Sequence, residues 1–448
     1  MKPQPRIVAG VAGTRFGSLF VLALLAPVAG GAAGLLGALF RLALHALDRL
    51  RGASIAAAHN HQALGFLVVI GVCAAAVACA AWLVRRFSPI ASGSGVPHVE
   101  AVLNGDVPPA PPGLIPVKFI GGALAIGAGL ALGREGPTVQ MGATVAHLLG
   151  VVCRRPWPDC RVLLAAGAGA GLATAFNAPI AGAVFVLEEL VRRFEAHIAI
   201  AALGASAAAI AVARALLGAA PDFAVAPLAY PGVQTWPLFV VLGAVAGLLA
   251  ALYNAALLRA LVVADRLGGW PVELRAAVIG AAVGALAWFL PDLVGGGDAI
   301  TQRTLIGGAT LAVLPLTFLL RFALGAVSYA AATPGGLFAP LLVLGAQLGL
   351  LCGTLCRLAF PAMDLDPTAF AVVGMAAFFT GMVQAPVTGI VLVIEMTASF
   401  SMLLPMIAAC FAAMLVPNLL GAPPIYDALR ERTARVTRTA GARARNNR

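Results

Sequence analysis

The chain has 448 residues, of which 61% are hydrophobic and only 10% are charged. This is far more apolar sequence than a water-soluble core of this length could bury, so the composition excludes a soluble globular protein. The formal net charge of +11 does not indicate nucleic-acid binding, because the basic residues are densest in the tail that follows the last apolar run. Long runs of Ala, Leu, Val and Gly without strict alternation predict an all-α integral membrane protein.

The first apolar run, about residues 19–47, is too long for the hydrophobic region of a signal peptide, and we expect it to remain as a membrane helix. Basic residues flank the whole apolar region and predict that both termini are cytoplasmic. The basic tail could alternatively bind anionic lipids or a partner, at about 1 kcal/mol per arginine. These residues are Lys2, Arg6 and Arg15 at the start, and Arg430, Arg432, Arg435, Arg438, Arg443, Arg445 and Arg448 at the end.

The sequence contains an internal repeat. The segment from Asn177 to Glu188 recurs from Gln384 to Glu395, with proline, glycine and glutamate at the same relative positions. Repeated apolar helices interrupted by Gly and Pro are typical of transporters whose site lies between two inverted-topology repeats near the bilayer midplane. We therefore predict tilted and broken helices in two such repeats. The expected bounds are 1–217 and 238–429 for the repeats, 218–237 for their connection and 430–448 for a basic cytoplasmic tail.

Three glycine- and proline-containing segments predict helix starts. Gly93-Ser-Gly-Val-Pro97 places a side-chain oxygen at an expected N-cap, and Gly133-Arg-Glu-Gly-Pro137 places Pro137 at an expected first helical position. Gly335-Gly-Leu-Phe-Ala-Pro340 is the counterpart in the second repeat. Unpaired backbone N–H groups at such starts attract anions, and converging starts would hold a small anion by partial charges alone. Taken singly, the first and third segments could be ordinary turns.

Glu135 is a stronger indication of function than those segments. A carboxylate inside apolar sequence is energetically costly and is a functional hypothesis by default. The alternative is that the adjacent Arg134 neutralises it as a structural ion pair.

Together the motifs identify a family resemblance. Gly93-Ser-Gly-Val-Pro97, Gly133-Arg-Glu-Gly-Pro137, Gly335-Gly-Leu-Phe-Ala-Pro340 and Pro424-Ile-Tyr426 occur in the order found in the CLC chloride channel and transporter family, which the chain resembles over nearly its whole membrane portion. The resemblance implies the CLC-type fold, a homodimer with one pathway per subunit, and a site without metal or other cofactor.

The resemblance also implies roles for individual residues. The Ser94 hydroxyl, the Tyr426 phenol and the backbone amides of Leu337 and Phe338 would hold a central chloride. Amides around Arg134, Glu135 and Gly136 would form an outer site, with Glu135 as the gating glutamate. An ionised Glu135 is itself an anion and can fill this group of amides, whereas protonation lets chloride enter in its place.

A second proton station is needed for exchange. The resemblance points to Glu189, although residues alone favour a solvated helix end beside Arg192 and Arg193. We interpret the repeat partners Glu188 and Glu395 as structural carboxylates that bind backbone at helix ends.

The chain departs from the family pattern at several positions. His98 and Asn104 stand where many relatives carry an acid. Any acidic cluster that faces the inner side would therefore contain fewer carboxylates, although Glu100 remains. Ser94 occurs where nitrate-preferring relatives resemble one another in having proline, which favours chloride.

We therefore expect a proton-coupled chloride antiporter of a cell membrane, in a bacterium the inner membrane, with chloride, protons, lipid and a second copy of the chain as partners. A passive chloride channel of the same fold is the alternative. An enzyme, specifically an intramembrane serine protease using Ser94, would need His45, His147 or His197 opposite it, and the sequence offers no evident set of carbonyl-stabilising groups.

Overall fold

The computed structural model describes residues 13–446 except 268 and 309, with side chains from residue 19 to residue 435. Within this range the chain is helical, without β-strands apart from two isolated bridges. The helices are α1 (Gly13–His59), α2 (Gln62–Phe87), η1 (Pro89–Ala91), α3 (Val96–Leu103), α4 (Leu114–Gly127), α5 (Glu135–Val152), α6 (Trp157–Phe176), α7 (Pro179–Phe185), η2 (Val186–Leu190), α8 (Ala196–Leu217), η3 (Val233–Thr235), α9 (Trp236–Arg266), α10 (Val272–Phe289), η4 (Pro291–Leu293), α11 (Asp298–Leu305), α12 (Leu314–Tyr329), α13 (Phe338–Ala359), η5 (Pro361–Met363), α14 (Pro367–Val383), α15 (Pro386–Thr397), η6 (Phe400–Met402), α16 (Leu403–Leu419) and α17 (Ile425–Asn446).

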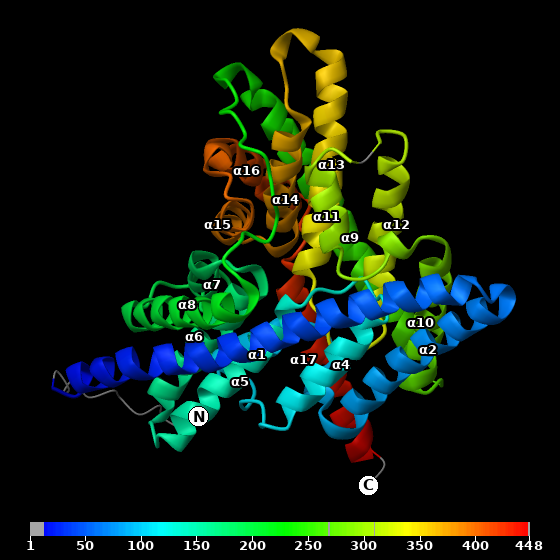
Figure 1. The fold of residues 1–448 in the computed structure, drawn as a ribbon. Coiled ribbons are helices and arrows are strands. Elements are labelled where there is room, and N and C mark those ends of the chain that lie inside the picture. Colours follow the sequence, from blue (N-terminus) through cyan, green and yellow to red (C-terminus); the bar gives the residue numbers. More distant parts are fainter. Residues whose placement is uncertain (1–12, 268, 309, 447–448) are drawn as a thin grey trace.

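Eight helical segments in this range are long and apolar enough to cross a membrane. Others are short, as the glycine- and proline-punctuated sequence predicts. The 14 residues of α4 span about 21 Å at 1.5 Å per residue, which is less than the roughly 30 Å of a bilayer core. The 47 residues of α1 exceed that thickness, and this helix crosses the molecule obliquely (Figure 1). The prediction of tilted and interrupted helices is confirmed.

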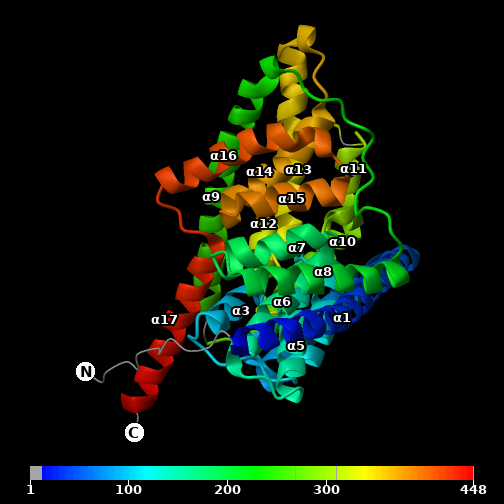
Figure 2. The same cartoon turned by 90° about the vertical axis from the view of Figure 1, so that its left-hand side faces the viewer.

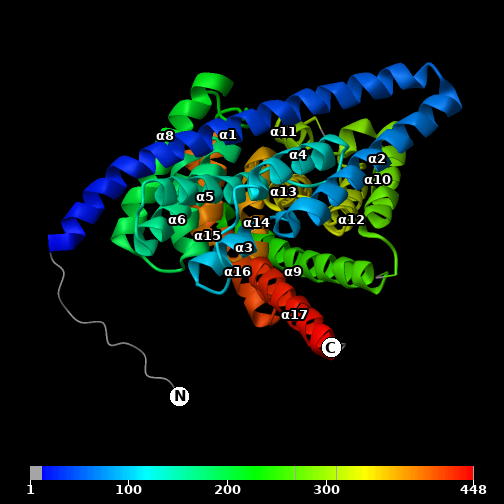
Figure 3. The ribbon, with the colours of Figure 1, turned by 90° about the horizontal axis from the view of Figure 1, so that it is seen from below.

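Corresponding helices of the two halves pack in corresponding pairs. Helix α5 packs on α6 as α13 packs on α14, and α1 packs on α8 as α9 packs on α16. Helix α2 packs on α10 and so joins one half to the other. Seen from below, α1 covers one side of the bundle while α9 and α16 lie toward the opposite side (Figure 3). The fold therefore has an internal two-fold character.

Helices α7 and α15 show directly that the repeats are inverted. Glu188, at the end of the first repeated segment, accepts hydrogen bonds from the backbone N–H groups of Val387 (3.0 Å) and Thr388 (2.6 Å) at the start of α15. Glu395, near the end of α15, accepts from Ile180 (3.1 Å) and Ala181 (2.8 Å) at the start of α7.

The two helices thus lie side by side with opposite directions (Figure 2). Each carboxylate satisfies N–H groups that a helix start leaves unpaired, and its negative charge complements the helix dipole. The interpretation of Glu188 and Glu395 as structural is confirmed.

Helix α17 lies apart from these pairs. Its first turns contact α3 and α14, and its remainder extends beyond the bundle (Figures 1 and 2). Part of the predicted basic regions falls outside the described residues or side chains: Lys2, Arg6, Arg15, Arg438, Arg443, Arg445 and Arg448.

The reciprocal caps predict the effect of Glu395→Ala. The substitution leaves two N–H groups at the start of α7 without their acceptor, at a cost of about 1–3 kcal/mol. We expect a lower midpoint of thermal unfolding in detergent, whereas Glu431→Ala, which removes an exposed carboxyl on α17, should leave the midpoint unchanged. Equal midpoints for Glu395→Ala and the unmodified protein would contradict a capping role.

Candidate functional site

Three helix starts meet in the interior of the bundle. The loops that precede α5 and α13 pair through two hydrogen bonds, from Gly133 N–H to Gly336 C=O (2.8 Å) and from Gly336 N–H to Gly133 C=O (2.7 Å). The loop before α3 joins the same region, because Gly335 N–H donates to Gly93 C=O (3.1 Å). The predicted convergence of the three glycine-containing segments is therefore present, with one segment from the second repeat paired to two from the first.

The local details of these starts differ from the sequence prediction. Ser94 is not an N-cap, because Gly95 occupies that position with φ of 88° and no side chain caps the helix. Helix α5 begins at Glu135 rather than at Pro137, with Arg134 as its N-cap. Both predictions were wrong because a glycine in the left-handed region and an arginine held by its side chain replace the usual capping residues.

Glu135 places its carboxylate at the start of a helix from the other repeat. The side chain is fully buried, and its Oε1 accepts a 2.6 Å hydrogen bond from the backbone N–H of Phe338, the first residue of α13. A Cβ atom on Gly133 or on Gly336 would come within 2.0 Å of a Glu135 carboxylate oxygen, so only glycine leaves room for it there. Glu135 therefore occupies the position that helix-terminus electrostatics favours for an anion.

Buried hydroxyl groups lie next to this carboxylate without hydrogen-bond partners. Ser94 Oγ and Tyr426 OH are buried and unpaired among the described residues, as is Glu135 Oε2. The Ser94 side chain packs on Gly136, and the Tyr426 ring lies 6.0 Å from that of Phe338, centroid to centroid. Unpaired polar atoms are costly in an apolar interior. Their concentration here marks a place where a polar ligand or ion can supply the missing partner.

Lys118 fixes the loop that carries Ser94. Its fully buried ammonium group donates to the carbonyl oxygens of Ala91 (3.0 Å) and Gly93 (2.7 Å). Ser94 N–H in turn donates to the Tyr329 hydroxyl at 3.3 Å. The Ser94 hydroxyl is thus held in place while it remains unpaired.

The Arg134 guanidinium does not form an ion pair with Glu135. It donates instead to Ala175 C=O (2.7 Å), Asp222 (2.8 Å) and Asp298 (2.7 Å), and it lies over the Phe176 ring. The hypothesis of a structural Arg134–Glu135 pair is therefore wrong.

Asp222 also binds Arg41 at 2.7 Å. This buried carboxylate, which lies between α8 and η3, thereby links α1 to the start of α5. The ion pairs of these two arginines with Asp222 and Asp298 hold together the segments around Glu135. The Glu135 carboxylate takes no part in them and binds the start of α13 instead.

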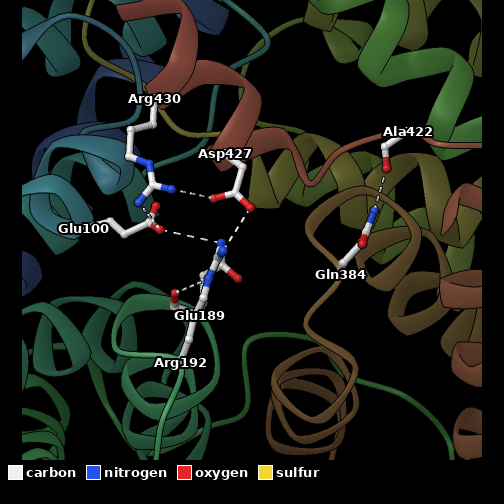
Figure 4. A network of polar contacts seen from close by, with 7 residues as sticks. All are labelled: Glu100, Glu189, Arg192, Gln384, Ala422, Asp427 and Arg430. Atoms are coloured by element: carbon white, nitrogen blue, oxygen red, sulfur yellow. Dashed lines mark hydrogen bonds and ion pairs between the residues drawn. The ribbon is translucent and has the colours of Figure 1, made fainter. Parts of the chain in front are cut away.

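Glu189 lies in a second polar group, away from Glu135 in sequence and on a different helix. It belongs to the π-helical turn η2 and is buried, so the solvated helix end that the residues alone favour is wrong. Its Oε1 lies 3.4 Å from an Arg192 nitrogen, and Arg192 also contacts Asp427 at 2.9 Å and Glu100 at 3.6 Å (Figure 4). π-Helical turns occur frequently at functional sites.

A surface pocket of about 580 Å³ reaches this second group. Glu189, Arg192, Gln384 and Pro424 are among the residues that line it. Gln384 donates to Ala422 C=O at 2.9 Å and so fixes the segment before α17 (Figure 4). The pocket therefore connects Glu189 to solvent, although its side chain is almost fully buried.

Sequence reasoning missed several residues of these groups. Asp222, Asp298, Asp427 and Arg430 were not selected, although charged residues near or within apolar sequence are a signal that could have found the first two. The contacts of Asp427 with Arg192 and of Arg430 with Glu100 join segments far apart in the chain and could not be inferred from spacing. Among the described residues, we find no group of three or more His, Cys, Asp or Glu side chains that could hold a metal ion.

Taken together, the fold and the site define a multi-pass helical membrane protein with a small polar site between two inverted repeats. The family model described as voltage gated chloride channel matches residues 76–418. The chain therefore belongs to this family.

Named relatives and solved structures resemble the chain over most of its length. The H(+)/Cl(-) exchange transporter ClcA of Vibrio parahaemolyticus is 36% identical over 92% of this chain and 90% of its own. ClcA of Klebsiella pneumoniae is 37% identical over 92% and 88%. The crystal structure of a slow cyanobacterial Cl-/H+ antiporter matches with a TM-score of 0.89 and 32% identity, covering 92% of this chain and 97% of that one.

The ion pairs of Arg134 predict that replacing Asp222 or Asp298 by alanine lowers the free energy of unfolding by different amounts. Asp222→Ala leaves Arg41 without its counterion and leaves the buried Arg134 with Asp298 alone, which costs about 3–5 kcal/mol. Asp298, whose side chain is 43% exposed, should cost no more than about 1 kcal/mol when replaced by alanine. The comparison is made by unfolding both variants in detergent with denaturant, and equal free energies of unfolding would show that Asp222 does not hold the group together.

Proposed function

We propose that the protein exchanges chloride for protons across a membrane. The observation that carries this proposal is the carboxylate of Glu135 at the start of α13, beside the unpaired hydroxyls of Ser94 and Tyr426. A carboxylate in that position holds the place of an anion, and it can lose its charge by taking up a proton.

Glu135 acts as the gate in this proposal. Ionised Glu135 binds the Phe338 amide and excludes chloride from it, because two anions cannot share one helix start. Protonation removes the charge, and the side chain gives way to chloride. The ionised carboxylate and chloride thus compete for one place, and the uptake or release of a proton by Glu135 decides which of them occupies it.

The remaining site residues hold chloride without trapping it. The hydroxyls of Ser94 and Tyr426 and the amides of Leu337 and Phe338 form the central site, and amides around Arg134, Glu135 and Gly136 form the outer one. The Arg134 guanidinium is occupied by Asp222 and Asp298, and the Lys118 ammonium group by two backbone carbonyl oxygens. Chloride is therefore held by partial charges, which permits release as well as binding.

Glu189 supplies the inner proton station. It is a carboxylate of the same repeat as Glu135, buried beside a surface pocket. This separate path for protons distinguishes an exchanger from a passive chloride channel of the same fold. The relatives named H(+)/Cl(-) exchange transporter favour the exchanger.

The family membership also supports a cellular setting. We place the protein in a cell membrane, in a bacterium the inner membrane, as a homodimer with one pathway per subunit and both termini in the cytoplasm. The repeats span residues 1–217 and 238–429, joined by 218–237 and followed by a basic tail at 430–448. The transport function makes the protein a carrier of ions rather than an enzyme.

A flux assay on purified protein in vesicles tests the function. Vesicles loaded with a high chloride concentration and diluted into low chloride should take up protons against a pH gradient as chloride leaves. A passive channel would release chloride without moving protons uphill, and this result would contradict the proposed exchange.

Glu135→Gln should uncouple the two ions. The amide side chain carries no charge, so it neither competes with chloride nor carries a proton. Uphill proton transport should fall to background while chloride flux continues and loses its dependence on pH; in the unmodified protein flux declines as pH rises, since fewer Glu135 side chains are protonated. Retained proton coupling in Glu135→Gln would remove Glu135 from its role.

Glu189→Gln should stop proton delivery from the inner side. Chloride movement should continue because Glu189 lies outside the anion site, but uphill proton transport should be absent. Simultaneous recording of chloride and pH in the vesicles checks this. Proton transport at the unmodified rate would assign the inner station to another residue, for example Glu100, a buried carboxylate that also contacts Arg192.

A further inference from the structure

The polar group around Glu189 contains more carboxylates than cations. Three carboxylates, from Glu100, Glu189 and Asp427, face two guanidinium groups, from Arg192 and Arg430. With all five ionised, the group carries one surplus negative charge, and two of its carboxylates, Glu100 and Glu189, are buried. One added proton makes it neutral, so the composition of the group favours binding of a single proton.

The distances indicate which carboxylate takes that proton. Glu100 is paired with Arg430 at 2.8 Å, and Asp427 is paired with Arg192 at 2.9 Å. Glu189 has only the longer 3.4 Å contact with Arg192. Hydrogen bonds to the charged form stabilise it, so the carboxylate with the weakest pairing is the one that becomes neutral first.

Arg192 lies between the three carboxylates (Figure 4). Its backbone has φ of 55°, in the left-handed region, two residues after the end of the π-helical turn. Its Nε also donates to Glu189 C=O at 3.2 Å, which fixes the base of the side chain. Strained backbone of this kind persists where the surrounding structure holds it, often at functional sites.

Arg430 completes the arrangement from α17. It contacts Asp427 at 3.3 Å as well as Glu100, and so holds both alternative partners of Arg192 in place. The remaining charged group that acts on Glu100 is the exposed Asp106. Asp427 directly follows Tyr426, so one turn of α17 contributes to both the proposed anion site and the proton station.

We propose that Asp427 is a positioning residue for proton exchange at Glu189, because it holds Arg192, together with Glu100, when Glu189 is protonated. This inference rests on the proposed function of Glu189. When Glu189 binds a proton, the partly exposed Arg192 keeps two ionised partners, Asp427 and Glu100. When Glu189 releases the proton, Arg192 is close enough to stabilise the carboxylate. The counterions thus make both protonation states of Glu189 accessible.

Asp427→Asn tests the inference. Without the Asp427 charge, Arg192 turns to Glu189 and keeps it ionised, so proton uptake through Glu189 slows. We expect the rate of chloride-driven proton uptake in vesicles to fall about tenfold, which corresponds to about 1.4 kcal/mol in activation free energy. Asp427→Glu retains the carboxylate and should restore most of the rate. Asp364→Asn makes the same change at an exposed aspartate between α13 and α14 and should have no effect.

Repeating the substitution in the Glu135→Gln variant separates this role of Asp427 from an effect on the neighbouring Tyr426. In Glu135→Gln, which carries chloride without protons, adding Asp427→Asn should leave chloride flux at the rate of Glu135→Gln alone. An equal slowing of chloride flux in that background would show that Asp427 acts on the anion path, and would overturn the inference. Proton uptake by Asp427→Asn at the unmodified rate would overturn it as well. Absence of proton uptake in the unmodified protein is a different result, because it contradicts the proposed function itself.

Discussion

The start of α13 at the centre of the bundle is the constraint on which the site depends. Its first N–H group lies in an apolar interior and needs a negative partner, which Glu135 provides from the other repeat. Neither repeat builds this contact alone, because α5 supplies the carboxylate and α13 the amide. The pairing of Gly133 with Gly336 fixes the two helix starts at the distance the contact needs. Inverted repeats are thus a way of bringing two helix starts together inside a membrane.

Several other charged side chains in the described interior have ionic or hydrogen-bonding partners, which distinguishes them from the atoms of the proposed anion site. Arg134 is held by Asp222 and Asp298, and Glu188 and Glu395 bind N–H groups of opposite helices. Unpaired buried atoms occur at several positions, but Ser94 Oγ, Tyr426 OH and Glu135 Oε2 lie together. This concentration of unused hydrogen-bonding capacity lies where an ion can use it.

The sequence was sufficient to predict the architecture. It was insufficient to predict the helix caps and the ion pairs between distant helices. The repeat, the broken helices and the pairing roles of Glu188 and Glu395 followed from pattern and from the cost of burying charge. The helix caps did not, because Ser94 was expected to cap α3 and Gly95 does so instead. Asp222 and Asp427 were missed since Arg134 and Arg192, the arginines that give them their roles, are more than 80 residues away in the chain. Local periodicity predicts helices, whereas ion pairs between distant helices depend on how those helices pack.

Helix α17 is where the proposed anion path and proton path meet most closely in the chain. Tyr426 points its ring toward Phe338, and Asp427, the next residue, binds Arg192 beside Glu189. Any movement of Arg192 that follows protonation of Glu189 changes its electrostatic attraction to Asp427. Because Tyr426 is the preceding residue, a shift of Asp427 acts on the Tyr426 backbone directly. Coupling between two sites requires an element whose position both sites bias. The first turn of α17 meets that requirement, so the two proposed stations can influence each other without direct contact between chloride and the proton.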